Sequence, residues 1–301
     1  MHSVSIPEAG IKRFIPENLS ECNPEQYVEM CDLIFRYQSG DINYDEFRTH
    51  AIYKLMKMKP EKSDIHDDQK YSQIYRLSEL IDSFMEEEND VKTIKMDYIH
   101  NPVPSFAPLY KRYYGPQDNF MDMTFGEYTT ALRIFHDFRA TGDMELLQVL
   151  AAVAYRPKKS FLFLRKRSSS FDGSIRQPLN TNDIDNRAKD FKYAPLGFVY
   201  GFYLLFASFQ KHLVTTKILW GGKELDFSIL FDTKATEPED DEVEFPGIGM
   251  DSIAFSLAES GAFGNITAVE NTSFWKIMVR IYDSVIKNNE LKKQQENVSN
   301  Q

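Results

Sequence analysis

The chain has 301 residues, a net charge of −10 and a hydrophobic fraction of 42%. This apolar content argues against global disorder, and the negative charge argues against nonspecific nucleic-acid binding as the main task. Its two cysteines, Cys22 and Cys31, are too few for a secreted disulfide scaffold and lack paired zinc-ligand spacing. We therefore expect reduced thiols in a cytosolic protein, and the first residues contain no apolar segment that predicts a secretion signal.

The first third of the chain contains three segments with helical periodicity. Asn23 precedes a proline at the first helical position and predicts a helix over 24–38, which is followed by a second over 44–58. A third predicted helix, over 69–88, ends in three glutamates, an unfavourable charge for a helix C-terminus that predicts fraying. Weak alternation over 93–99 predicts a short strand.

The middle of the chain begins with a proline-rich strap over 101–123, which we expect to be extended and rigid. Thr124 then predicts the N-cap of a strong helix over 125–140, and Glu127 three residues later predicts a reciprocal capping box. A helix over 144–155, rich in leucine and alanine, follows.

The most apolar stretch, residues 194–210, carries no charge over seventeen positions. A membrane span needs about 20 apolar residues, and this run is shorter and rich in aromatic side chains. We expect a buried central helix that begins near Pro195, in which Gly197 and Gly201 allow close helix packing. Membrane contact and a surface covered by a partner remain alternatives. Residues 218–222 predict an extended segment and a glycine turn.

These elements predict a mainly α fold with a few short β-strands. We expect a smaller N-terminal helical subdomain over 1–100, the strap over 101–123, and a main helical domain over 124–301. In the main domain, the central helix is predicted to pack against the helices over 125–140 and 144–155 and against the C-terminal helix. That last helix is expected to fray from Lys287, where the sequence becomes polar.

Two charge blocks flank the apolar run in sequence. The basic block over 156–167 holds six basic and no acidic residues around an apolar alternation at 161–164, and the acidic loop over 237–244 holds six acidic residues. The basic block fits a solvated edge strand or loop, a protein contact, pairing with the acidic loop of the same chain or of a neighbouring copy, or nucleic-acid stacking. The candidate partner-binding residues are Arg156, Lys158, Lys159, Arg165, Lys166, Arg167, Phe161, Phe163, Glu239, Asp240, Asp241 and Glu242.

The sequence contains no catalytic, cofactor or metal motif. Residues 38–47 imitate half of a calcium loop but lack its first carboxylates, which favours a helix–turn–helix with an N-capping Asp41 or Asn43. The glycines at 247–249 lack the strand and the third glycine of a phosphate cradle. We therefore predict a protein that is not an enzyme. The alternatives are nucleic-acid association through Arg165, Lys166 and Arg167, or an active site assembled from His136, Asp137, Tyr155 and Arg156.

Several segments resemble tail-assembly and tail-associated proteins of phages and prophages of Bacteroidetes-type bacteria. They are the opening Ile15-Pro16-Glu17 with the helix from Asn23, NPVPSF at 101–106, TFGEYTTALRIFHDF at 124–138, LAAVAYRP at 150–157 and LAESGAFGN at 257–265. The resemblance implies a non-enzymatic role in virion morphogenesis, chaperoning or joining parts of a tail. The implied partners are tail components or a second copy, and the implied location is the bacterial host cytoplasm or the virion.

Overall fold

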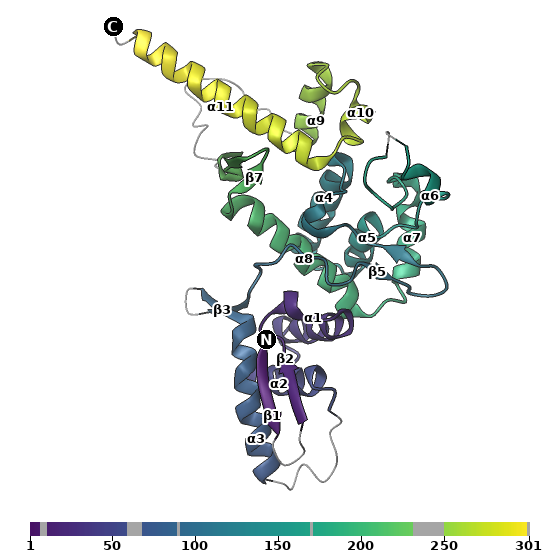
Figure 1. The fold of residues 1–301 in the computed structure, drawn as a ribbon, viewed down its shortest axis with the longest axis vertical. Helices are drawn as coiled ribbons and strands as arrows, with labels where there is room; N and C mark the ends of the chain where they lie inside the picture. Colours follow the sequence, from purple (N-terminus) through teal and green to yellow (C-terminus); the bar gives the residue numbers. More distant parts are fainter. Residues whose placement is uncertain (7–10, 59–67, 89–90, 169–170, 231–249, 300–301) are drawn as a thin grey trace.

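The computed structural model describes residues 1–6, 11–58, 68–88, 91–168, 171–230 and 250–299. Over these ranges the fold is mainly α, which confirms the predicted class (Figure 1). The helices are α1 (Pro24–Gln38), α2 (Tyr44–Leu55), α3 (Asp68–Ser78), α4 (Phe125–Thr141), α5 (Met144–Ala154), α6 (Leu162–Arg165), α7 (Ile184–Phe191), α8 (Leu196–Thr215), α9 (Met250–Glu259), α10 (Ile266–Glu270) and α11 (Phe274–Ser299).

Every sheet among the described residues is a two-stranded antiparallel hairpin. The pairs are β1 (His2–Ile6) with β2 (Ile11–Ile15), β3 (Met85–Glu88) with β4 (Val91–Ile94), β5 (Ser105–Phe106) with β6 (Tyr113–Tyr114), and β7 (Ile218–Trp220) with β8 (Lys223–Leu225). The last pair confirms the extended segment and glycine turn predicted at 218–222. A single cluster of buried apolar side chains links the N-terminal helices to the rest of the described chain.

Local signals fix the starts of several helices. Asn23 caps α1 and Asn43 caps α2, each through a reciprocal capping box. In the second box the Glu46 carboxylate accepts a hydrogen bond from the Asn43 amide at 2.9 Å. The half calcium loop is therefore the capped turn of a helix–turn–helix, as predicted. Among the described residues, no group of three or more potential ligands could hold a metal ion.

The single helix predicted over 69–88 is wrong in its second half. Helix α3 ends at Ser78, a 3₁₀ segment, η4 (Glu79–Phe84), follows, and β3 then pairs with β4. The hairpin places Glu87 opposite Lys92, and Glu86 forms an ion pair with Lys211 at 2.7 Å. Two of the three glutamates that would oppose a helix dipole, Glu86 and Glu87, thus gain cationic neighbours on a strand.

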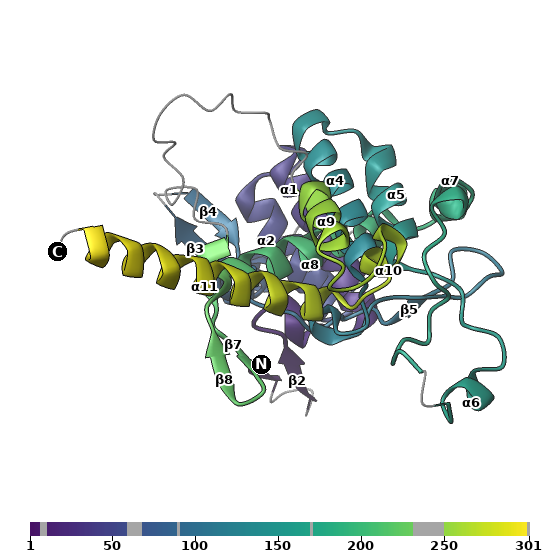
Figure 2. The same cartoon turned by 90° about the horizontal axis from the view of Figure 1, so that it is seen from above.

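Helix α8 is the buried centre of the fold, as predicted (Figures 1 and 2). It packs against α5, and aromatic contacts join it to α4, where the Phe135 and Tyr203 ring centroids are 5.0 Å apart, and to α11, where Phe209 and Trp275 are 5.8 Å apart. The sequence did not indicate its closest neighbour, which is α1. A Cβ added to Gly197 would lie 1.9 Å from the Val28 carbonyl oxygen, so these two helices meet backbone to backbone.

The proline strap is packed onto the central helix. Phe106 stacks on Phe198 of α8 with ring centroids 4.0 Å apart. The Asn101 side chain donates to the Pro116 carbonyl at 2.8 Å, and the Tyr155 hydroxyl donates to the Val103 carbonyl at 2.7 Å. These contacts hold the strap over the junction between the end of α5 and the start of α8.

The predicted fraying from Lys287 is also wrong. Helix α11 continues to Ser299 and extends away from the other helices in both views (Figures 1 and 2). Ion pairs within the helix support it, since Asp283 contacts both Arg280 at 3.2 Å and Lys287 at 2.7 Å. Among the described helices, none combines the length and apolarity that a membrane crossing requires.

Candidate interaction surfaces

Arg156, predicted as a partner contact, is 1% exposed and belongs to a buried charge cluster. Its Nη1 forms a close ion pair with Glu127 Oε1 at 2.6 Å, and the other Glu127 oxygen pairs with Arg176 at 3.2 Å. Arg176 also pairs with Asp122 at 3.0 Å and donates to the Ala154 carbonyl at 2.7 Å. The cluster joins α4, the end of α5 and the segment before α7, so its members are structural.

The cluster also changes the predicted cap of α4. Thr124 is the N-cap and accepts a hydrogen bond from the Glu127 amide at 3.3 Å. The Glu127 carboxylate does not return to the cap, because it is bound by Arg156 and Arg176 inside the protein. The predicted reciprocal capping box is therefore only half formed.

Burial lowers the pKa of Arg156 to about 10, and the Glu127 carboxylate opposes this effect. The guanidinium therefore stays protonated at neutral pH. For Asp122, burial raises the pKa, but the Arg176 charge and hydrogen bonds from Gln117 and Ser174 outweigh it and hold the pKa below its usual range. Both ion pairs are thus formed at neutral pH.

Lys159 is the second basic candidate that lies inside the protein. Its ammonium contacts the Asp172 carboxylate at 2.6 Å and donates to the Ser174 carbonyl at 3.0 Å. Because Arg156 and Lys159 are buried and paired, neither offers an unpaired charge to a partner. No local sequence pattern indicates this burial, because the carboxylates that pair with them lie elsewhere in the chain.

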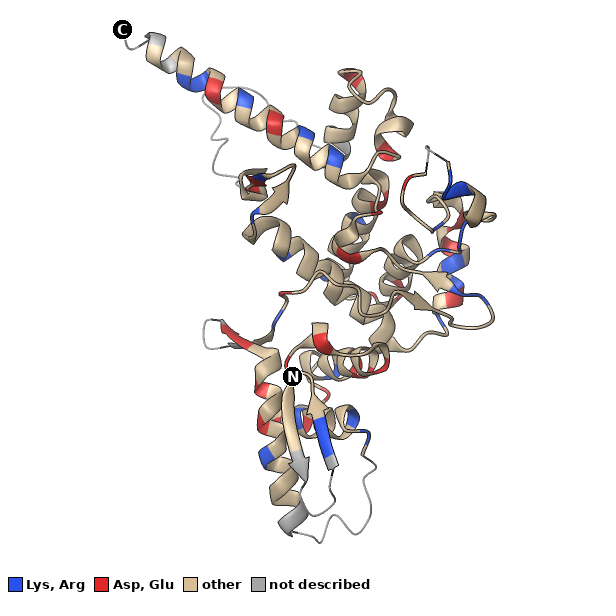
Figure 3. Cartoon of the chain, viewed as in Figure 1, with Lys and Arg blue, Asp and Glu red and all other residues tan. Residues whose placement is uncertain are grey.

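The rest of the basic block forms an exposed aromatic and basic surface. The alternation at 161–164, for which an edge strand was one of the alternatives, is instead the short helix α6, preceded by Phe161 with a left-handed φ of 54°. Phe161 and Phe163 are 79% and 67% exposed, and the Arg167 guanidinium lies 4.2 Å from the Phe163 ring centroid. Figure 3 shows the basic residues gathered on α6. The remaining exposed candidates are Lys158, Arg165 and Lys166.

The acidic candidates Glu239, Asp240, Asp241 and Glu242 lie outside the described residues, as do the glycines at 247–249. The described chain ends at Leu230 on one side of this segment and resumes at Met250 on the other. Both of these flanking residues line the same groove.

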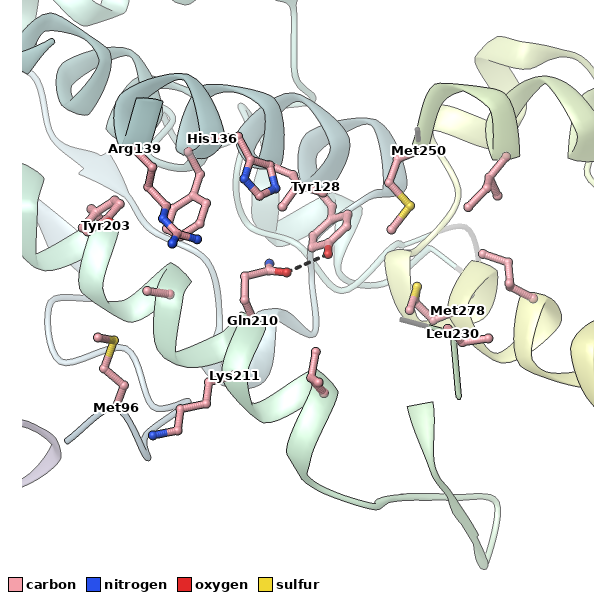
Figure 4. A pocket seen from close by; sticks show the side chains of 16 residues that line it. Met96, Tyr128, His136, Arg139, Tyr203, Gln210, Lys211, Leu230, Met250 and Met278 are labelled. Atoms are coloured by element: carbon pink, nitrogen blue, oxygen red, sulfur yellow. Dashed lines mark hydrogen bonds between the residues drawn. The ribbon is translucent and has the colours of Figure 1, made fainter. Parts of the chain in front are cut away.

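This apolar groove, about 730 Å³ in volume, lies between α4, α8, α9 and α11 (Figure 4). Most of its lining is aliphatic, aromatic or thioether, and it was not predicted from the sequence. Its apolar lining residues are Met96, Leu132, Phe135, Ala207, Val214, Leu230, Met250, Ile253, Met278 and Ile281. Because they come from six separate segments, no local pattern in the sequence indicates the groove.

One polar pair lies in the groove wall. The Tyr128 hydroxyl donates to Gln210 Oε1 at 3.0 Å (Figure 4), and burial raises the pKa of Tyr128 well above its usual range. Gln210 Nε2 is buried and has no hydrogen-bond partner among the described residues. A buried amide without an acceptor costs about 1–3 kcal/mol, so this donor favours an occupant that supplies a carbonyl or carboxylate oxygen.

The remaining residues of the lining are Tyr203 and three basic residues. His136 and Arg139 project from α4 and Lys211 from α8 (Figure 4). Lys211 is paired with Glu86, whereas within the described chain no carboxylate lies within ion-pair distance of Arg139, whose guanidinium lies 5.8 Å from the Phe135 ring centroid. The groove therefore combines apolar walls with a basic rim on a chain whose net charge is −10.

The residues of the alternative active site do not share one environment. Tyr155 and Arg156 are buried and hydrogen bonded or paired with Val103 and Glu127, whereas His136 lines the groove. These partners account for Tyr155 and Arg156 as structural groups.

No family model matches the chain, and neither the curated proteins nor the solved structures contain a significant match.

Proposed function

We propose that this chain is a non-enzymatic interaction protein that holds an apolar segment of a protein partner in the groove. The observation that carries the proposal is the groove itself, with apolar walls from four helices, a basic rim and a buried amide donor without an acceptor. An apolar hollow of this size is a recognised form of ligand and peptide site.

The occupant we propose is an amphipathic helix with acidic residues beside its apolar face. Grooves formed between helices commonly receive the apolar face of a partner helix, with side chains spaced by three or four residues. The rim argues for acidic flanks, because Arg139 has no described carboxylate partner and His136 lies one helical turn from it. Such charges would set the orientation and the association rate more than the affinity.

The resemblance to phage tail-assembly proteins supplies the first partners to test. In this proposal the chain chaperones or joins tail components, in the cytoplasm of a bacterial host or in the virion. The tail-tube protein and the tape-measure protein of the same genome are the defined probes.

The experiment is a binding assay between the purified chain and each of these two proteins. Ala207→Trp fills the groove, because Ala207 lies in its lining, and Ala140→Trp is the matched control at an exposed position of α4 outside it. We expect Ala207→Trp to weaken binding at least about tenfold and the control to bind like wild type. Absence of binding to both proteins, or equal binding by a correctly folded Ala207→Trp chain, would overturn the proposal.

A second candidate function is single-stranded nucleic-acid binding by the exposed surface on α6. The specific observation is the stack of Arg167 on Phe163, because aromatic rings and guanidinium groups together bind bases and phosphates. A mobility-shift assay at low and moderate salt tests it, and no shift at low salt would end the idea.

A further inference from the structure

A second pocket, about 410 Å³ in volume, is lined by residues of the basic block, of the segment around Asn180 and of α7. Four cationic side chains take part in its lining, namely Arg156, Lys159, Arg165 and Arg187, together with one carboxylate, Asp183. It is separate from the apolar groove, since the two linings share no residue.

The charges in this wall are only partly balanced. Arg156 and Lys159 are paired with Glu127 and Asp172. Among the described residues, no carboxylate lies within ion-pair distance of Arg165 or Arg187. The pocket therefore keeps an excess of positive charge.

Arg187 is held in the wall by backbone groups. Its Nε donates to the Ala152 carbonyl at 3.0 Å and its Nη2 to the Asn180 carbonyl at 3.5 Å. Burial lowers the pKa of Arg187, although Asp183 opposes this effect. A fixed and partly desolvated guanidinium is arranged to bind an anion with little further loss of side-chain freedom.

Arg156 gives an independent sign that the wall is incomplete. Although it is 1% exposed, its Nε is buried and has no hydrogen-bond acceptor within the described part of the chain. Buried donors of charged groups are normally satisfied by protein, by water or by an ion. The orphaned donor lies on a residue that lines the same pocket as Arg165 and Arg187.

We propose that this pocket binds a phosphate group, as inorganic phosphate or as a phosphate monoester of a small molecule. Several guanidinium groups around one pocket favour phosphate over carboxylate, because phosphate offers more acceptor oxygens in a tetrahedral arrangement. Arg165 and Arg187 would bind the anion directly, while Arg156 and Lys159, each already paired with a carboxylate, form the wall behind them.

The test is calorimetric titration of the full chain with inorganic phosphate and, separately, with phosphoserine, at an ionic strength held constant with sodium chloride. Arg165→Gln and Arg187→Gln each remove one proposed contact. The matched control is Arg167→Gln, an exposed arginine two residues from Arg165 that does not line the pocket.

We expect saturable binding below about 10 mM phosphate, weakened at least about tenfold by Arg165→Gln and by Arg187→Gln and unchanged by the control. Tighter binding of phosphoserine would identify a monoester as the ligand, and equal or tighter binding of inorganic phosphate would identify the free ion. No binding of either compound, or equal loss in all three variants, would overturn the proposal. Because Arg165 is exposed, its variant keeps the test decisive if Arg187→Gln does not fold.

Discussion

Replacing Gly197 with alanine tests the backbone contact between α1 and α8. The added Cβ would lie 1.9 Å from the Val28 carbonyl oxygen and 2.8 Å from the Asp32 amide nitrogen. Ordinary contact distances are about 3.5 Å, so the two helices would have to separate by more than 1 Å. Neither obstacle is a flexible side chain that could rotate away.

Overpacking of a well-packed core costs about 1–3 kcal/mol and sometimes more. Because both obstacles belong to the α1 backbone, we expect Gly197→Ala to lower the free energy of unfolding by at least about 3 kcal/mol. Whole domains are stable by only about 5–15 kcal/mol, so the loss is large enough to measure. Gly201→Ala should cost less, because its new Cβ meets the side chains of Tyr27 and Cys31, at 2.8 and 3.2 Å.

Urea unfolding followed by circular dichroism measures these changes. Gly126→Ala on α4 is the comparison with a milder overlap, because its new Cβ would lie 3.0 Å from Glu270 Cβ and 3.2 Å from the Glu270 carbonyl oxygen, and the helix preference of alanine, about 0.5–1 kcal/mol, opposes this cost. We expect its free energy of unfolding to stay within about 1 kcal/mol of wild type. If Gly197→Ala were as stable as wild type, the contact between α1 and α8 would not be as described.

Other predictions concern the buried polar groups. Arg176→Met should destabilise the protein by about 3–5 kcal/mol in urea unfolding, because it leaves two buried carboxylates without their shared partner, whereas Arg133→Met, at an exposed position of α4, should change little. The lowered pKa of Asp122 contributes stability above the usual aspartate pKa of about 3.9 that is lost as pH falls through the lower folded value. The urea concentration at the unfolding midpoint should therefore decrease as the pH falls below about 4. If the Asp122→Asn chain lost stability with falling pH as steeply as wild type, the assignment to Asp122 would be refuted. Cys22 and Cys31 are buried, and burial raises the pKa of Cys22 to about 12, so Ellman's reagent should label both thiols only after unfolding; rapid labelling of the native chain would contradict their burial.

Local signals in the sequence were enough for the positions of many helices. Asn23 and Thr124 mark helix starts because a short polar side chain satisfies free backbone amides, and Gly142 ends α4 with a left-handed φ of 69°. The uncharged run around Gly201 predicted the central helix, because a run this apolar has to be buried.

Interactions between distant segments could not be predicted. Glu86 lies on strand β3 and not on the predicted helix. Its carboxylate pairs with Lys211, which is 125 residues away in the chain. Arg156 looked like a surface residue because its neighbours are basic, yet its partner Glu127 lies on another helix. A formal charge in the sequence does not reveal whether the fold will surround it with carboxylates.

The apolar groove had no local signal for the same reason. Tyr128 and Gln210 are ordinary positions on two predicted helices, and only their approach creates the wall with an unpaired amide. The chain positions Leu230 and Met250 reach the groove from either side of nineteen intervening residues. The site follows from helix packing, which a single sequence does not specify.

Site-specific photo-crosslinking from the groove tests the proposed function most directly. Benzoylphenylalanine placed at Val214, in the groove lining, is compared with the same group at Leu219, which is exposed on β7 and lies outside the lining. With the tail-tube or tape-measure protein present, we predict crosslinks from position 214 to an apolar helical segment flanked by acidic residues, and none from position 219. Crosslinks from position 214 only to residues 231–249 of the same chain, or equal crosslinking from both positions, would contradict the proposal.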